Sequence, residues 1–180
     1  PDNPLCLACH GNEGFAMPGA DGQMRPLHII KDKFESSAHG KQLCVGCHKD
    51  ITAIPHGKNG SIKVSCVQCH EDLWAAAVKE NRTRDSEKLG MVKQQIDRYM
   101  KSIHARPNIE DQSRTNATCY NCHDAHYVYP QGSSVRADWR LNIPNVCGKC
   151  HAGQLAAYST SVHGQEVLQK ANKPLTREQL

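Results

Sequence analysis

Ten cysteines and eleven histidines are the residues of this 180-residue chain best suited to chemistry. All ten cysteines fall into five copies of one pattern, two cysteines separated by two residues and followed directly by a histidine. The copies are Cys6-Leu-Ala-Cys9-His10, Cys44-Val-Gly-Cys47-His48, Cys66-Val-Gln-Cys69-His70, Cys119-Tyr-Asn-Cys122-His123 and Cys147-Gly-Lys-Cys150-His151. This spacing is the attachment signature of c-type haem, in which the two thiols form thioethers and the histidine binds the iron. The sequence therefore predicts five covalent haems.

Three other uses of paired cysteines explain the pattern less well. A disulfide framework does not require a histidine after every second cysteine. Zinc sites need histidines spaced from one another, and a thioredoxin-like redox pair occurs once in a chain and not five times. The repetition favours haem over all three.

Six histidines remain outside the motifs, and five haem irons would each need a sixth ligand. The six are His28, His39, His56, His104, His126 and His163. Three of them share a context of small residues, in Ser37-Ala38-His39-Gly40, Ser102-Ile103-His104-Ala105 and Ser161-Val162-His163-Gly164. Small neighbours let the backbone approach a flat macrocycle, and His56 lies in a Pro-His-Gly turn that presents its ring in a similar way.

His126 lies only three residues after the motif histidine His123. The motif holds the backbone on one face of its haem, and three residues cannot carry the chain around the macrocycle edge to the opposite face. We therefore predict that His126 binds the iron of a neighbouring haem and so links two cofactors. A histidine that faces solvent or a propionate is the alternative.

One of the six histidines is in excess, and the residues leave its identity open. His28 lacks the small-residue context and is the first candidate. His163 is its rival, because its element near the C-terminus resembles the approach to a haem motif that does not follow. Met17 and Met24 are alternative sixth ligands near the first motif, and methionine ligation would raise a haem potential.

The composition predicts the fold class. Leu, Ile, Val and Phe make up about 18% of the chain, below the level of about 20% that a polypeptide usually needs for a core. Five porphyrins would supply the missing interior. We predict one domain over residues 1–180, mostly irregular with short α-helices packed on haem and little or no β-sheet, and largely unfolded without haem.

The one long helical pattern falls between the third and fourth motifs, over residues 73–102. Its charged middle, residues 80–88, fits a solvated helix face better than a break. No segment resembles a transmembrane helix. Because covalent haem attachment takes place outside the cytoplasm, we expect an exported periplasmic or extracellular protein whose signal sequence was removed or lies outside this sequence.

The formal charge of +4 changes once haem is counted. Ten propionates would bring it to about −6 with ferrous iron and about −1 with ferric iron, so a basic partner fits at least as well as an acidic one. No basic stripe with interleaved aromatic residues indicates nucleic acid.

The segments FESSAHGKQLCVGCHKDITAIPHGK, KSIHARPNIEDQSRTNATCYNCHDAHYVYP and LNIPNVCGKCH resemble the multihaem cytochromes c that repeat S-V-H-G and C-x-x-C-H elements. Those proteins are similar to periplasmic electron-transfer subunits that accompany membrane b-type cytochromes or quinol-oxidising modules. The resemblance implies that His39, His56, His104, His126 and His163 are distal ligands and that His28 is not. Relatives often continue past an element like Ser161–Gly164 into a further motif, so a fragment or processed form is one interpretation of this chain.

Electron transfer through five bis-histidine haems is the function that the ligand supply favours, which makes the protein an electron carrier and not an enzyme. A reductase of small nitrogen or sulfur oxo-species is one alternative. It needs an iron with an open position, whereas all five motifs end in histidine and enough spare histidines exist to close every iron. A polymeric extracellular cytochrome filament is the other, with His28 or His163 as a ligand to the next subunit.

Replacing His126→Ala tests the predicted link between two haems. All five haems should stay attached, because Cys119, Cys122 and His123 are unchanged. Carbon monoxide should then bind one ferrous haem in five, since the sixth position of a neighbouring haem becomes open. Optical titration with carbon monoxide measures this, and a low-spin spectrum without carbon monoxide binding would make His28 the better ligand candidate.

Overall fold

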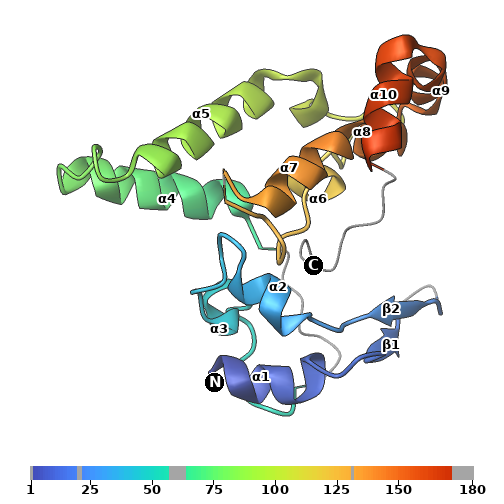
Figure 1. Ribbon diagram of the computed structural model, residues 1–180. Coiled ribbons are helices and arrows are strands. Elements are labelled where there is room, and N and C mark those ends of the chain that lie inside the picture. The colour runs from blue at the N-terminus through green and yellow to red at the C-terminus, as the bar shows by residue number, and fades with distance from the viewer. Residues whose placement is uncertain (1, 20–21, 57–63, 131, 172–180) are drawn as a thin grey trace. The chain divides into compact units, whose positions relative to one another are not determined.

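The computed structural model describes residues 2–19, 22–56, 64–130 and 132–171, as short helices joined by irregular segments (Figure 1). The helices are α1 (Asn3–His10), α2 (Lys31–Glu35), α3 (Cys44–Cys47), α4 (Cys66–Lys79), α5 (Glu87–Lys101), η1 (Ile103–Ala105, a 3-10 turn), α6 (Cys119–Cys122), α7 (Ser134–Leu141), α8 (Ile143–Gly148), α9 (Ala152–Thr160) and α10 (Val162–Ala171). Strands β1 (Ala16–Pro18) and β2 (Met24–Pro26) form an antiparallel hairpin. The predicted fold class, short helices with much irregular structure and little sheet, is confirmed.

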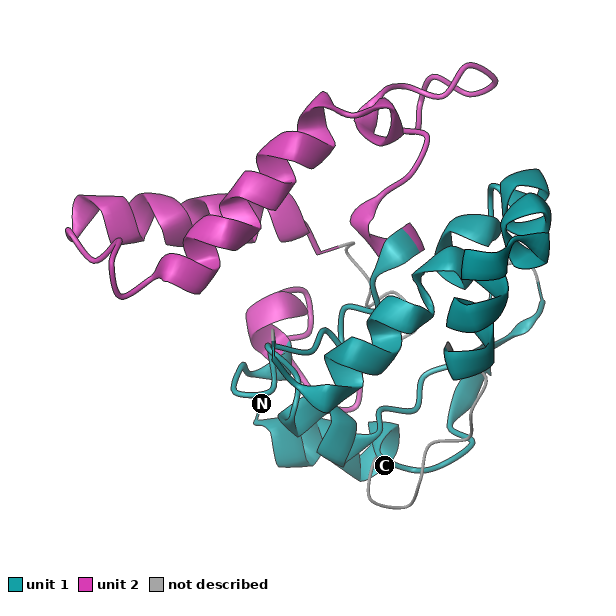
Figure 2. Ribbon diagram, turned by 45° about the horizontal axis from the view of Figure 1, so that its top comes forward, with its two compact units in different colours: residues 1–44, 122–180 teal, residues 45–121 magenta. Residues whose placement is uncertain are grey.

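The chain divides into two compact units (Figure 2). Unit 1 contains residues 1–44 and 122–180, and unit 2 contains residues 45–121. Both boundaries fall inside cysteine motifs, after Cys44 and after Asn121. The single domain expected over residues 1–180 stays a prediction.

In unit 2, α4 and α5 pack side by side as a helical hairpin (Figure 1). Ser65 caps the start of α4, where its side-chain oxygen accepts a hydrogen bond from the backbone N–H of Gln68 at 3.1 Å. Gly90 on α5 lies against the ring of Trp74 on α4, and a Cβ at Gly90 would lie 3.1 Å from that ring. The absence of a side chain at Gly90 therefore sets how closely the two helices approach.

The single helix predicted over residues 73–102 is wrong, because the charged segment after Lys79 is a break. Asn81 has a positive φ of 55°, which asparagine tolerates better than most residues. The N–H of Arg82 donates to the carbonyl of Ala77 at 2.8 Å, and the N–H of Asn81 donates to the carbonyl of Val78 at 3.1 Å. This pair of bonds is a Schellman motif, which satisfies the last carbonyls of α4 and ends the helix.

In unit 1, helices α7 to α10 form a local cluster in which α9 packs on both α8 and α10, and α10 packs on α7. Gly148 at the end of α8 lies so close to Leu155 of α9 that an added Cβ would overlap its side chain. The cluster thus depends on close backbone approach more than on large apolar side chains.

Few apolar side chains are buried in the described part of the chain. Phe34 and Ala77 are the buried hydrophobic residues there, Ser37 is the buried polar one, and no large side chain is completely buried. Ile109 is 95% exposed and Val162 is 79% exposed. The described helices also include none that is long and apolar enough to cross a membrane. Protein atoms alone therefore do not build a core here, as the composition predicted.

The contact between Gly90 and Trp74 gives a test of the helical hairpin. Gly90→Val should lower the free energy of unfolding by about 2 kcal/mol, because the branched side chain forces the indole out of its packing. Gly153→Val on α9 is the matched control, since a Cβ at Gly153 meets no atom within 4 Å. Thermal unfolding followed by circular dichroism compares the two, and equal melting temperatures would contradict the close packing of α4 on α5.

Candidate functional site

The cysteine pairs of the five motifs lie on or beside helical turns. Four pairs lie entirely within a helix, in α1, α3, α4 and α6, and in the fifth Cys147 lies in α8 with Cys150 just after its end. Residues three positions apart on a helix share one face, so each such pair presents both sulfurs to the same side. No disulfide joins any of the ten cysteines, which are all exposed or half-buried. This is the local geometry that two thioether bonds to one macrocycle require.

Among the first three motifs, those that are consecutive in the sequence also lie close to one another in space. In unit 1, the side chain of Asn3 at the start of α1 accepts a hydrogen bond from the N–H of Cys44 at 2.8 Å and donates to the carbonyl of Gln42 at 3.0 Å. In unit 2, burial raises the pKa of the Cys47 thiol, and the charges of Cys69 and Cys66 raise it further. The second motif therefore lies beside the first and within electrostatic reach of the third.

The fourth motif is likewise close to the third, and the fifth motif is close to the fourth. In unit 2, the hydroxyl of Tyr120 donates to the carbonyl of Val64, next to the third motif. Burial, followed by the charge of Cys66, raises the pKa of Tyr120 to about 12. In unit 1, burial raises the pKa of Cys122, and the charges of Cys147 and Cys150 add to it.

Two of the predicted iron ligands are held in the tautomer that iron binding needs. The Nδ1 atom of His10 lies 2.9 Å from the carbonyl oxygen of Leu27, and Nδ1 of His39 lies 3.2 Å from that of Ala125. A carbonyl oxygen only accepts, so each Nδ1 must donate a proton. The lone pair then belongs to Nε2, the ring nitrogen directed to a metal when Nδ1 bonds a backbone carbonyl.

His39 and His126 are brought together in unit 1 although 87 positions separate them in the sequence. The N–H of Ala38 donates to the carbonyl of Val128 at 2.6 Å, which pairs the two segments. The buried ring of Phe34 lies edge-on to the His126 ring at a centroid distance of 6.5 Å. Nδ1 of His126 is 3.8 Å from the carboxylate of Asp124. The backbone pairing therefore brings two predicted sixth ligands into the same part of unit 1.

A longer repeat than Ser-x-His surrounds three of the predicted sixth ligands. An aromatic residue precedes each serine by three positions, in Phe34–His39, Tyr99–His104 and Tyr158–His163. In every copy the serine N–H donates to the carbonyl of the aromatic residue, at 2.9 Å for Ser37, 2.8 Å for Ser102 and 3.0 Å for Ser161. The aromatic residue lies in the last turn of α2, α5 or α9, and the histidine follows it by five positions in each copy. The sequence analysis missed the aromatic position, although its spacing is constant in all three copies.

In two copies of this repeat, the position after the histidine is too close to backbone atoms to hold a side chain, so it requires glycine. An added Cβ at Gly40 would overlap the carbonyl oxygens of Glu35 and Phe34, and one at Gly164 would overlap that of Tyr158. The third copy has Ala105, which lies in the 3-10 turn η1. In this copy Ala117 holds the backbone at His104, because its N–H donates to the His104 carbonyl at 2.9 Å. The carbonyl of Ala117 in turn accepts from the hydroxyl of Tyr99 at 2.7 Å.

The remaining candidates lie in less regular places. His28 is half-buried, and both of its neighbours in the sequence are hydrogen-bonded to His10. The carbonyl of Leu27 accepts from the His10 ring, and the N–H of Ile29 donates to the His10 carbonyl at 2.6 Å. His56 is exposed, and residues 57–63 after it lie outside the described residues. His163 is exposed at the start of α10, while Met17 and Met24 lie in β1 and β2. His48, His70 and His151 each directly follow their cysteine pair.

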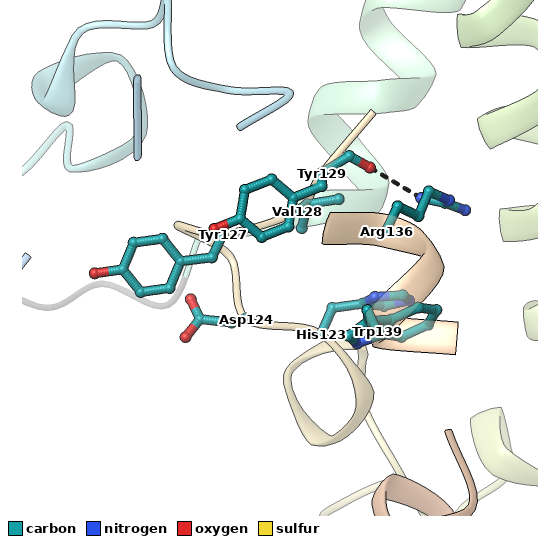
Figure 3. A pocket seen from close by; sticks show the side chains of 7 residues that line it. All are labelled: His123, Asp124, Tyr127, Val128, Tyr129, Arg136 and Trp139. Carbon is teal, nitrogen blue, oxygen red and sulfur yellow. Dashed lines mark hydrogen bonds between the residues drawn. The ribbon is translucent and has the colours of Figure 1, made fainter. Parts of the chain in front are cut away.

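The fourth motif histidine stacks on a tryptophan (Figure 3). The rings of His123 and Trp139 are 5.4 Å apart between centroids and inclined by 20°. They line a cavity of about 50 Å³ together with Asp124, Tyr127, Val128, Tyr129 and Arg136. Burial, followed by the charge of Arg136, lowers the pKa of His123. Both causes keep the imidazole neutral, which is the form that binds iron.

The residues therefore fit covalent haem. Cysteine pairs on or beside single helical turns, a histidine directly after each pair and a scarcity of buried apolar side chains are what a multihaem c-type cytochrome requires. Residues 65–141, which contain the third and fourth motifs and the α4–α5 hairpin, match the family model of cytochrome c554 and c-prime. This segment is similar to the multihaem c-type cytochromes of that family. No curated protein and no solved structure matches the chain.

Gly40 gives a test of His39 as an iron ligand. Gly40→Ala should displace the backbone at His39, because the new methyl group overlaps two carbonyl oxygens, and so open the sixth position of one haem in five to carbon monoxide. Gly46→Ala is the matched control, since a Cβ there meets no atom within 4 Å and Ala8 holds the same place in the first motif. Optical spectra in carbon monoxide compare the variants, and a Gly40→Ala protein with wild-type spectra would remove His39 from the ligand set.

Proposed function

We propose that the chain binds five covalent c-type haems and carries electrons along them between a membrane or periplasmic donor and an acceptor. The observation that carries this proposal is the order of the attachment motifs. Asn3 before the first motif is hydrogen-bonded to Cys44 of the second, and Tyr120 of the fourth is hydrogen-bonded to Val64 beside the third. Cysteines of the third motif add to the raised pKa of Cys47, and cysteines of the fifth add to that of Cys122, which is consistent with proximity of these motifs. Neighbouring cofactors in an unbroken series are what electron transfer over the length of a protein needs.

Each side chain has a defined task in this proposal. When bound, the haems supply one-electron redox chemistry at iron. The ten cysteines would hold the haems covalently, and each iron would take one imidazole from the motif histidines His10, His48, His70, His123 and His151. His39, His56, His104, His126 and His163 provide the second, with His28 in reserve. Two imidazoles on each iron leave no position for a substrate, so the protein is an electron carrier.

The proposed location is the periplasm or the extracellular side, because c-type haem is attached outside the cytoplasm. Its partners are redox proteins, among which a membrane quinol-oxidising b-type cytochrome module is one candidate donor. The propionates make the loaded protein more acidic than the polypeptide, so a partner with a basic docking surface fits better than nucleic acid.

A polymeric filament is the second candidate function, and the start of α10 favours it. His163 is exposed there beside Val162, which is 79% exposed. A histidine that reaches a haem of the next copy would build an open head-to-tail assembly. Light scattering across a concentration series separates the candidates: growth that disappears in His163→Ala supports the filament, and a monomer at all concentrations rules it out.

The haem content tests the main proposal. Intact mass and a pyridine haemochrome assay should give five haems per chain, and the oxidised spectrum should be low-spin. Midpoint potentials should lie mostly below zero against hydrogen, because two imidazoles stabilise ferric iron better than imidazole with thioether. The titration should be broad, since neighbouring haems interact. A haem count below five, or a high-spin fraction that binds carbon monoxide in the unmodified protein, would contradict it.

A further inference from the structure

Arg136 on α7 is a half-buried cation whose hydrogen-bonding groups the described protein atoms satisfy only in part. Its Nη1 donates to the carbonyl of Tyr129 at 3.1 Å, and its Cζ lies 6.0 Å from the centroid of the Trp139 ring (Figure 3). Its Nε is buried and has no hydrogen-bond partner among the described residues. A buried donor without a partner is costly, so its presence indicates a missing acceptor.

The shape of the guanidinium points to the kind of acceptor. Arginine presents parallel N–H groups that match the two oxygens of a carboxylate or phosphate. Nη1 is already bonded to Tyr129, so the edge that contains Nε is the one that remains for such a pair. The carboxylate among the residues that line the cavity belongs to Asp124, which accepts a hydrogen bond from the N–H of His126 at 2.9 Å.

The size of the cavity limits which anionic group can accept a hydrogen bond from Arg136 there. About 50 Å³ holds a group equivalent to a few water molecules, which suits a carboxylate. The cavity is lined by His123, the motif histidine of the fourth haem. The anionic groups attached to a haem whose iron binds at His123 are its two propionates.

We propose that Arg136 anchors a propionate of the haem held by Cys119, Cys122 and His123, and that its charge raises the reduction potential of that haem. This inference rests on the proposed function, because it requires haem at the fourth motif. A fixed positive charge favours the ferrous state, which carries one positive charge less than the ferric state. Trp139 supports the arrangement, since its ring stacks on His123 and also faces the guanidinium.

Arg136→Gln tests the anchor, and Arg140→Gln on the same helix is its matched control. Arg140 is exposed and does not line the cavity, so its replacement removes the same formal charge away from the haem. Redox titration followed by electron paramagnetic resonance should show one haem of five shifted to lower potential in Arg136→Gln. We expect an about tenfold lower ferrous-to-ferric ratio at a fixed potential, or about 59 mV for one electron. Equal titrations of the two variants would overturn the proposal.

Two further measurements keep the result interpretable. If Arg136→Gln does not accumulate, Arg136→Lys keeps the charge but loses the paired donors, and a smaller downward shift is expected; an unchanged potential would overturn the anchor. Titrations of the wild type in phosphate-free buffer and with added inorganic phosphate should agree, whereas a phosphate-dependent potential would assign the site to a free anion. Mass spectrometry without haem on Cys119 and Cys122 in the wild type would overturn the proposed function itself, while haem there with no shift in Arg136→Gln overturns only this inference.

Discussion

The scarcity of apolar side chains is the constraint on which the rest of this structure depends. With about 18% Leu, Ile, Val and Phe, the chain buries only Phe34 and Ala77 as apolar side chains in its described part. Hydrophobic burial is the dominant favourable contribution to folding, so the apolar surface must come from elsewhere. In the proposed function, covalent haem would provide it, and the thioether bonds would fix each porphyrin to a particular helical turn. We therefore expect haem attachment and folding to be coupled.

Local hydrogen bonds do much of the positioning that a core does in other proteins. Asn3 ties the first motif to the second, and Asn116 closes the long loop before the fourth, where it donates to the carbonyl of Ile103 at 2.8 Å. Serines after α2, α5 and α9 bond back to an aromatic carbonyl and so direct a histidine away from each helix end. Side-chain-to-backbone bonds of this kind need no apolar surroundings. Such bonds allow a polar chain to position its histidines without the packing of a hydrophobic core.

The sequence predicts the chemistry of this protein better than its helix boundaries. Haem attachment fixes the types and spacing of Cys119, Cys122 and His123, so the motifs can be recognised without a structure, and the fold class follows from composition. The break after α4 was missed because its charges suit a solvated helix face equally well, whereas Asn81 decides it by adopting a left-handed backbone conformation. The unpaired Nε of Arg136 has no sequence signal, since arginines on polar helices are common. The pairing of distal histidines with haems also depends on three-dimensional contacts that no periodicity encodes.

The order of the motifs has a further consequence for electron transfer. Each contact that relates one motif to the next lies within a single unit: first to second in unit 1, second to fourth in unit 2, and fourth to fifth again in unit 1. The second and fourth motifs contain the unit boundaries, so the short helices α3 and α6 belong to both. In the proposed function, the two thioether bonds at each of these motifs would be made by cysteines of one short helix, so the attachment of those two haems would depend on local structure.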